Sequence, residues 1–324
     1  MTTPIRWGIL GASNFAATEM GPAIHRAKGA ELSALATSDP SKADRFDFAP
    51  GLFVHHDYDA LLADPEIDAV YIPLPNHLHV EWTLKALDAG KHVLVEKPLA
   101  MTAPEFDAVI AKRDASGLLA AEAYMIVHHP QFIRARELYN EGHIGSLVRV
   151  DCAFSYDNRA KPDNIRNKPD TGGGGLADIG VYAFGAARYV TGQEPVEITH
   201  ADIREQNGVD VYAEVCATFD TFLYTGMVSM RMFSRQEITF HGEEGAMRLT
   251  CPFNANVFGE ARLEITGPNP MHVRTERWPG VNHYVLQVEN FGAALRGDAE
   301  YPCPLEFSRG TQVMIDRVRA KAAG

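Results

Sequence analysis

A glutamate and a lysine stand side by side in the segment Glu96-Lys97-Pro98, directly after the apolar run His92–Val95. Such a run is typical of a buried parallel strand, and in open α/β sheets ligands bind at the carboxyl ends of the strands. Charged side chains are rarely buried without partners, so Glu96 and Lys97 are candidates for ligand binding and chemistry. The alternative is a strand that simply ends in a polar loop.

A turn that contains glycine follows the first apolar run, Ile5–Leu10. The turn Gly11-Ala12-Ser13-Asn14-Phe15-Ala16 is a variant of the Gly-x-Gly-x-x-Gly/Ala pattern that binds dinucleotides. Gly11 permits the tight turn, and Ser13 stands at the usual place of the second glycine, where its hydroxyl can bond a phosphate. We expect residues 11–15 to bind a nucleotide; the alternative is a strand-to-helix turn without a ligand.

The end of the second predicted strand distinguishes the two nicotinamide cofactors. An acidic residue there holds the ribose 2′-hydroxyl of NAD, whereas a basic neighbour accepts the 2′-phosphate of NADP. The chain has Ser38 at this place, with Asp39 beside it and Lys42 four residues beyond Ser38. The hydroxyl and the lysine favour NADP and Asp39 favours NAD, and on balance we expect NADP.

A proline-rich loop follows the apolar run Ala69–Ile72. Proline restricts the backbone, so this loop can lie along the ribose and nicotinamide of the cofactor. The residues concerned are Pro73, Leu74, Pro75 and Asn76. His79, at the start of the next helix, either contacts the cofactor as well or bonds its own loop.

Two different patterns divide the chain. Up to residue 122, short apolar runs alternate with helical patterns that begin near Ser13, Tyr58, His77 and Pro104, which is typical of βαβ units. The expected strands are Ile5–Leu10, 32–37, Ala69–Ile72, His92–Val95 and 118–122. Beyond residue 123, strands follow one another without helices between them, which favours a mostly antiparallel sheet; they are 147–156, 211–219, 225–232, 237–241, 247–250 and 262–266.

Helical stretches at 130–141, at 176–190 and from about 284 complete the second half. We therefore expect an α/β protein of two domains. Residues 1–123 form a dinucleotide-binding domain with a parallel sheet. Residues 124–324 form an α+β domain built on a large, mostly antiparallel open sheet.

Composition narrows the function classes. The 324 residues carry a net charge of −12, which argues against nucleic acid and anionic membranes as partners. No apolar stretch reaches the ~18 residues of a transmembrane helix, and the N-terminus lacks a signal-peptide pattern. The four cysteines have no metal-like spacing, so we expect reduced thiols, no metal and a cytoplasmic location.

Together these motifs resemble the glucose–fructose oxidoreductase, inositol dehydrogenase and rhizopine-catabolism family (Gfo/Idh/MocA). The resemblance covers nearly the whole chain and is most specific in Glu96-Lys97-Pro98 and in the downstream motif Asp178-Ile179-Gly180-Val181-Tyr182. It also includes the turn 11–16, the proline-rich loop, and residues 89–100, 164–167, 172–175 and 242–245.

The resemblance implies an N-terminal Rossmann domain, a C-terminal domain whose sheet often forms a dimer interface, and NAD(P)-dependent hydride transfer on a sugar, polyol or related alcohol. The family's catalytic lysine falls on Lys97, which with Glu96 also borders the cofactor, and its aspartate falls on Asp178. Its usual histidine is replaced by Tyr182, as in the branch of D-xylose and dihydrodiol dehydrogenases. Val127 stands where many relatives carry arginine, so the resemblance does not carry over the substrate specificity of those relatives.

Asp178 and Tyr182 are four residues apart, so on a helix they share one face. Tyrosine and lysine titrate near ~10 and ~10.4, so neither is a base at neutral pH. A cationic Lys97 close to Tyr182 would lower the pKa of the tyrosine and stabilise a developing alkoxide. Tyr182 is then the general acid/base, with Lys97 as the alternative, and Asp178 orients the substrate hydroxyl or Lys97. A tyrosine that only packs is the structural alternative.

The loop ahead of this helix holds two candidate substrate ligands, Asn164 and Arg166, which could equally belong to a solvated loop. Four glycines at 172–175 would let the backbone approach a ligand closely.

Three functions remain in competition. The first is an NAD(P)-dependent sugar or polyol dehydrogenase or reductase that forms a homodimer or a higher homo-oligomer. The second is a glycosidase that oxidises its sugar transiently with NAD. The third is a non-catalytic sensor of sugars or dinucleotides, against which the presence of Lys97, Asp178 and Tyr182 together argues.

Overall fold

The structure is a computed structural model that describes residues 3–324. The chain forms two compact units. The first contains the residues up to His128 together with Asn282–Ser308, and the second contains His129–Val281 and Arg309–Gly324. Within residues 3–324, no helix combines the length and the apolar character needed to cross a membrane.

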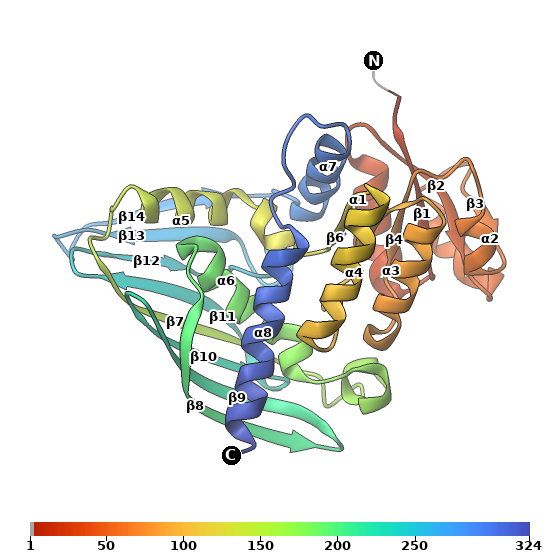
Figure 1. Cartoon of the computed structure of the whole chain (residues 1–324). Coiled ribbons are helices and arrows are strands. Elements are labelled where there is room, and N and C mark those ends of the chain that lie inside the picture. The colour runs from red at the N-terminus through yellow and green to blue at the C-terminus, as the bar shows by residue number, and fades with distance from the viewer. Residues whose placement is uncertain (1–2) are drawn as a thin grey trace. The chain divides into compact units, whose positions relative to one another are not determined.

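The first unit is built on a six-stranded sheet in the order β3-β2-β1-β4-β5-β6 (Figure 1), with every pair of neighbours parallel. Its strands are β1 (Ile5–Leu10), β2 (Ala30–Ala36), β3 (Phe53–His55), β4 (Ala69–Ile72), β5 (His92–Val95) and β6 (Ala120–Glu122). The strand order reverses beside β1, which is where open sheets of this kind form their ligand crevice. The predicted Rossmann sheet is confirmed, and only the short β3 was not predicted.

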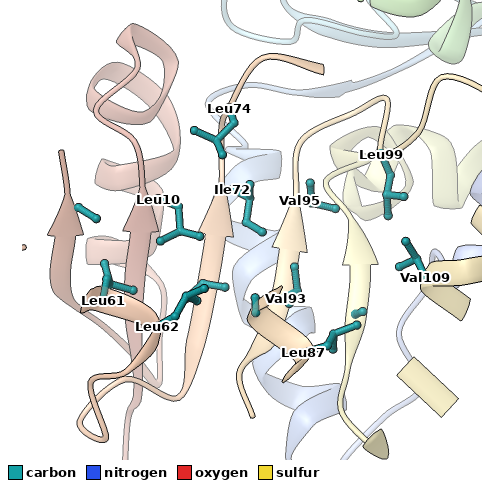
Figure 2. Close-up of a cluster of buried hydrophobic side chains, with 14 of the residues drawn as sticks. Leu10, Leu61, Leu62, Ile72, Leu74, Leu87, Val93, Val95, Leu99 and Val109 are labelled. Atoms are coloured by element: carbon teal, nitrogen blue, oxygen red, sulfur yellow. The ribbon is translucent and has the colours of Figure 1, made fainter. Parts of the chain in front are cut away.

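Three helices cover one face of this sheet: α2 (Tyr58–Leu62), α3 (His79–Asp88) and α4 (Ala103–Ser116). Figure 2 shows Leu10, Ile72 and Val95 directed to this face from three neighbouring strands, where they pack with leucines from the helices. All four residues of β4 are buried. A strand covered on both faces needs apolar residues throughout, which is why this sequence is continuously apolar rather than alternating.

The opposite face is covered in part by a segment from near the end of the chain. The π-helical turn η1 (Ala16–Met20) continues into α1 (Gly21–Arg26), and α7 (His283–Leu295) packs against both. The ring of Trp7 on β1 lies 5.0 Å from the ring of Phe291 on α7. We expected the first domain to contain only residues 1–123, but Asn282–Ser308 joins the first unit because α7 provides apolar cover for the large side chains on this face.

The second unit is built on an eight-stranded sheet in the order β14-β13-β12-β11-β7-β10-β9-β8. Its strands are β7 (Leu147–Asp157), β8 (Pro195–Gln206), β9 (Val209–Phe219), β10 (Leu223–Ser229), β11 (Arg231–Gly242), β12 (Ala246–Leu249), β13 (Ala261–Thr266) and β14 (Val273–Trp278). All neighbours are antiparallel except β7 and β10. The predicted mostly antiparallel sheet is confirmed. Its two edge strands, β8 and β14, were not predicted, because each exposes much of its length and lacks a clear apolar alternation.

Helices in the second unit pack on the sheet and carry the residues of interest. The π-helical turn η7 (Leu176–Gly180) runs directly into α6 (Val181–Thr191), and α6 packs against β7 and β10, whereas α5 (Pro130–Asn140) packs against β13 and β14. The Tyr224 hydroxyl donates to the carbonyl of Ala183 over 3.0 Å, which ties α6 to β10. Ten of the eleven residues of α6 are buried, so this helix has no polar face. A last helix, α8 (Leu305–Ala322), begins in the first unit and continues into the second.

Candidate active site

The glycine turn after β1 has the conformation that the sequence predicted. Gly11 has a φ of +108°, a backbone conformation that residues with a side chain rarely adopt. A Cβ at this position would lie 3.0 Å from the side chain of Leu74. The Ser13 hydroxyl oxygen accepts the N–H of Ala16 over 3.0 Å. Ser13 therefore caps the first helical turn, and its own hydrogen is not used in this bond.

An arginine that the sequence analysis missed lies against this turn. Arg45, in the 3-10 helix η2 (Pro40–Phe46), donates to the carbonyl of Ala12 and to the side-chain oxygen of Asn14. Arg45 follows Lys42 by three residues, so the two basic residues lie on neighbouring turns of one short helix. This spacing is visible in the sequence.

Asp39 has a structural task at the end of β2. Its carboxylate caps η2, with Oδ1 accepting from the Ser41 hydroxyl at 2.6 Å and from the Ser41 N–H at 3.2 Å. These bonds to Ser41 and the charge of Lys42 lower the pKa of Asp39. Ser38 is exposed beside it. The acidic residue that argued for NAD is thus engaged in its own loop.

The C-terminal segment adds a tyrosine near the same turn. The ring of Tyr284, at the start of α7, meets the ring of Phe15 edge-on with centroids 5.4 Å apart. Burial raises the pKa of Tyr284, and the negative charges of Glu96 and Glu19 act in the same direction. Tyr284 therefore lies close to the glutamate that follows β5, although nothing in the local sequence connects the two.

Lys97 lies near two carboxylates at the carboxyl end of the sheet, the half-buried Glu96 and the buried Glu122. Glu96 accepts from the Tyr71 hydroxyl at 2.6 Å and from the Lys97 N–H at 3.3 Å. Glu122, at the end of β6, accepts the N–H of Leu99 over 2.8 Å. Burial raises the pKa of both glutamates, and the charge of Lys97 opposes that rise in each. Lys97 thus adds a positive charge near a pair of carboxylates, of which the sequence analysis identified only Glu96.

His79 bonds the protein backbone. The ring is fully buried, with Nδ1 2.8 Å from the carbonyl oxygen of Pro98 and Nε2 2.7 Å from that of Leu74. Burial lowers its pKa to about 4, whereas the two backbone contacts favour the charged form; a neutral ring has one N–H and can donate to only one of the two carbonyls. We expected His79 either to contact the cofactor or to bond its own loop; in the structure both ring nitrogens face protein carbonyls, and the side chain connects the proline-rich loop to the segment of Lys97.

In the second unit, Asp178 is held from two sides. Its Oδ2 accepts from the Tyr156 hydroxyl at 2.5 Å, and its Oδ1 lies 2.8 Å from Nε of Arg166. The predicted residues Asp178 and Arg166 are therefore brought together, and Tyr156, near the end of β7, is a further member that sequence reasoning missed. Asn164 has a local role, because its side-chain oxygen accepts the N–H of Arg166 over 3.0 Å and starts the short helix η5 (Ile165–Asn167).

The charges of this cluster fix the protonation of its members. The negative charge of Asp178 is the main cause of a raised pKa for Arg166, which stays cationic. Burial, together with the charge of Asp178, raises the pKa of Tyr156 above its usual value. The Tyr156 hydroxyl therefore stays protonated and serves as a donor to the carboxylate.

Tyr182 lies on the same helical segment as Asp178. Its ring centroid is 6.0 Å from that of Phe154 and 5.9 Å from that of Phe253, and its charge contributes to the raised pKa of Arg166. The expected α-helical spacing holds only in part, because Asp178 lies in the π-helical turn η7 and Tyr182 in α6. Turns of this wider kind often occur at functional sites. The unit thus presents a carboxylate, a guanidinium and two phenols, which suits the recognition of hydroxyl groups.

Comparisons with known proteins agree with these observations. Residues 5–124 match the model of the oxidoreductase family with an NAD-binding Rossmann fold (GFO_IDH_MocA), and residues 132–248 match the GFO/IDH/MocA C-terminal domain. An uncharacterised oxidoreductase of Rhizobium meliloti is 35% identical over 98% of this chain and 97% of its own. D-xylose 1-dehydrogenase (NADP(+)) 2 of Haloferax volcanii is 34% identical over 89% of this chain and 88% of its own.

Solved structures give a similar result. The crystal structure of KijD10, a 3-ketoreductase from Actinomadura kijaniata in complex with NADP and TDP-benzene, superimposes with a TM-score of 0.89 at 29% identity, over 98% of both chains.

Proposed function

The chain belongs to the GFO/IDH/MocA family of oxidoreductases, and we propose that it transfers a hydride between NADP(H) and a carbon–oxygen centre of a sugar or sugar derivative. One observation carries the proposal. The glycine turn after β1 and Lys97 after β5 follow strands of one parallel sheet, so both lie at its carboxyl edge, where a nucleotide and a reacting group can meet.

The residues around the turn fit an NADP-type dinucleotide. Gly11 permits the close turn, and Ser38, Lys42 and Arg45 supply one hydroxyl and two cations where a 2′-phosphate would lie. Oδ1 of Asp39 accepts two bonds from Ser41, which weakens the case for Asp39 as the acceptor of a ribose 2′-hydroxyl. When bound, the nicotinamide supplies or accepts the hydride.

The protein's own groups then handle the proton and the charge. We assign proton transfer to the Tyr182 hydroxyl, because Tyr156 is held protonated as a donor to Asp178. Lys97 stabilises the negative charge on the reacting oxygen, which develops as an alcohol loses its proton ahead of hydride transfer or as hydride reaches a carbonyl. Asp178, fixed by Arg166 and Tyr156, orients the substrate hydroxyl, and the partly exposed guanidinium of Arg166 contacts a neighbouring hydroxyl. The proposal therefore requires one positive charge and one proton donor to act on the same reacting oxygen.

The relatives suggest two substrate classes, free aldoses such as D-xylose and nucleotide-linked ketosugars. Absorbance of reduced nicotinamide distinguishes them, with NADP⁺ and a panel of aldoses in one arm and NADPH and TDP-linked ketosugars in the other. Net oxidation or reduction of the nicotinamide also excludes a glycosidase, because such an enzyme regenerates its cofactor within each catalytic cycle. Binding of NADP⁺ without turnover in either arm would favour a sensor, and failure to bind any nicotinamide nucleotide would overturn the proposal.

We further propose a cytoplasmic homo-oligomer that associates through the face of the eight-stranded sheet opposite α6. This face is hollowed by about 370 Å³ beside Asp151, Thr225 and Glu237, and charged pairs such as Arg248–Glu237, at 2.6 Å, can exchange partners across an interface. The monomer has a mass of 35.6 kDa, and sedimentation velocity should give at least twice this value. A protein that sediments as a monomer at micromolar concentration would contradict the assembly.

Cofactor preference should depend on Ser38 and Arg45. Ser38→Asp places a carboxylate where the 2′-phosphate is expected, so the ratio of kcat/KM for NADP⁺ to that for NAD⁺ should fall. Arg45→Gln should weaken NADP(H) binding by about tenfold, or about 1.4 kcal/mol, and leave NAD(H) unchanged. Arg26→Gln, at another exposed arginine, is the control. Equal losses for both cofactors in Arg45→Gln would mean that Arg45 only supports the turn.

Lys97→Ala should lower kcat by ~10²-fold or more, because electrostatic stabilisation of a developing oxyanion contributes on that scale. The Kd for the nucleotide should stay within about tenfold, measured by titration of the bound cofactor's fluorescence. Lys85→Ala, which removes an exposed lysine paired with Glu81, should leave both quantities unchanged. A Lys97→Ala enzyme that retains more than about a tenth of kcat would refute the electrostatic role.

Two tyrosine variants separate proton transfer from orientation. Tyr182→Phe keeps the ring beside the stacked pair Phe154 and Phe253, so Tm should change little while kcat falls by ~10²-fold or more. Tyr156→Phe removes one donor to Asp178 but leaves Arg166 in place, and kcat should fall by less than about tenfold. The opposite ranking would transfer the acid/base role to Tyr156, and a Tyr182→Phe enzyme that is fully active but melts lower would make Tyr182 structural.

A further inference from the structure

The four-glycine run at 172–175 lies against an aspartate of the same chain. Gly174 has a φ of +121°, and a Cβ on it would lie 2.3 Å from Oδ1 of Asp210. A Cβ on Gly175 would lie 3.3 Å from Oδ2 of the same carboxylate. We expected these glycines to let the backbone approach a ligand. In the structure they make room for Asp210, the second residue of β9.

Asp210 binds the start of the helical segment that carries Asp178. Its Oδ2 accepts the N–H of Leu176 over 2.6 Å. Burial raises the pKa of this carboxylate, and the N–H of Leu176, the charge of Arg319 and the N–H of Gly175 oppose that rise. The first N–H groups of a helix have no partner within the helix, and Gly175, at the N-cap, has no side chain to supply one. A strand distant in sequence therefore provides the cap, and bonds from N–H groups to a carboxylate are among the stronger hydrogen bonds.

The same glycine run also holds the loop of Arg166. The N–H of Gly174 donates to the carbonyl of Arg166, and the N–H of Gly173 donates to the carbonyl of Lys168, each over 3.0 Å. A Cβ on Gly173 would lie only 2.6 Å from the carbonyl oxygen of Arg166. One short backbone segment is thus bound to Asp210 on one side and to the arginine loop on the other.

We propose that Asp210 is a positioning residue that holds the arginine loop and the first turn of the helix in one register, so that the guanidinium of Arg166 meets the carboxylate of Asp178. Asp178 comes only two residues after Leu176, within the turn that Asp210 caps. Without the cap this turn would fray first, and small displacements of an orienting group reduce turnover strongly. The inference rests on the proposed function, in which Asp178 orients the substrate.

Asp210→Asn is the sharpest test because it preserves the shape of the side chain. The amide oxygen can still accept the N–H of Leu176, but the amide lacks the negative charge that strengthens this bond, and Asp210→Ala loses the acceptor altogether. We expect kcat to fall about tenfold in Asp210→Asn and further in Asp210→Ala, with the Kd for NADP(H) within about twofold of wild type, because the nucleotide turn belongs to the other unit. Asp220→Asn, at an exposed aspartate, is the matched control.

Amide hydrogen exchange gives a readout that does not depend on turnover. Peptides that cover residues 172–180 should exchange faster in Asp210→Asn than in wild type, while peptides from β1 and β5 stay unchanged. If Asp210→Ala does not fold, Gly175→Ala, which crowds Oδ2, replaces it and should reproduce both effects.

The outcomes separate this inference from the proposed function. A wild-type enzyme that turns over neither sugar class refutes the proposed function, and hydrogen exchange then still decides whether Asp210 holds the turn. If the wild type is active and Asp210→Asn changes neither kcat nor hydrogen exchange, the inference is overturned. Faster exchange with unchanged kcat also overturns it, because Asp210 is then an anchor without influence on Asp178.

Discussion

Buried carboxylates organise both units of this protein. Removing an ionised carboxylate from water is costly unless cations or hydrogen-bond donors surround it. Glu96 and Glu122 in the first unit, and Asp178 and Asp210 in the second, all have such partners in hydroxyl, N–H or guanidinium groups. Because each partner comes from a different element, satisfying the carboxylates fixes how strands, loops and helix starts are joined around the site.

The partners also define what each charged group can do. Arg166 and Tyr156 take both oxygens of Asp178, so this carboxylate acts as an oriented acceptor and Tyr156 remains a donor. Lys97 has a different environment, because its charge balances two glutamates whose pKa values burial raises. A cation in such a pocket is held in place and can stabilise negative charge on a bound oxygen.

Local hydrogen bonds also support the cofactor preference that we propose. Asp39 looks, by its position, like the acidic residue that holds the ribose of NAD, but it caps a short helix through Ser41. Arg45, on that helix, lies against the glycine turn instead. The identity of one residue after the second strand is therefore a weaker guide than the bonds that this residue makes.

The sequence by itself determined the alternation of strands and helices in residues 5–122, the glycine turn and the position of Lys97, since these depend on local periodicity and on turn chemistry. The bounds of β1, β4 and β5 were predicted to the residue. Asp178, Tyr182 and Arg166 were identified from their spacing and from a family resemblance. These features depend on neighbours within a few residues along the chain.

Only the tertiary structure decided the rest, because it depends on contacts between distant segments. The pattern of α7 predicted a helix, but only Trp7 and the face around it determine that this helix completes the first unit. Tyr156, Glu122 and Asp210 are ordinary strand residues until their partners Asp178, Leu99 and Leu176 are placed beside them. For the same reason the glycines at 172–175 suggested a ligand: sequence shows that a backbone must pass close to something, and only the fold shows that it is the carboxylate of Asp210.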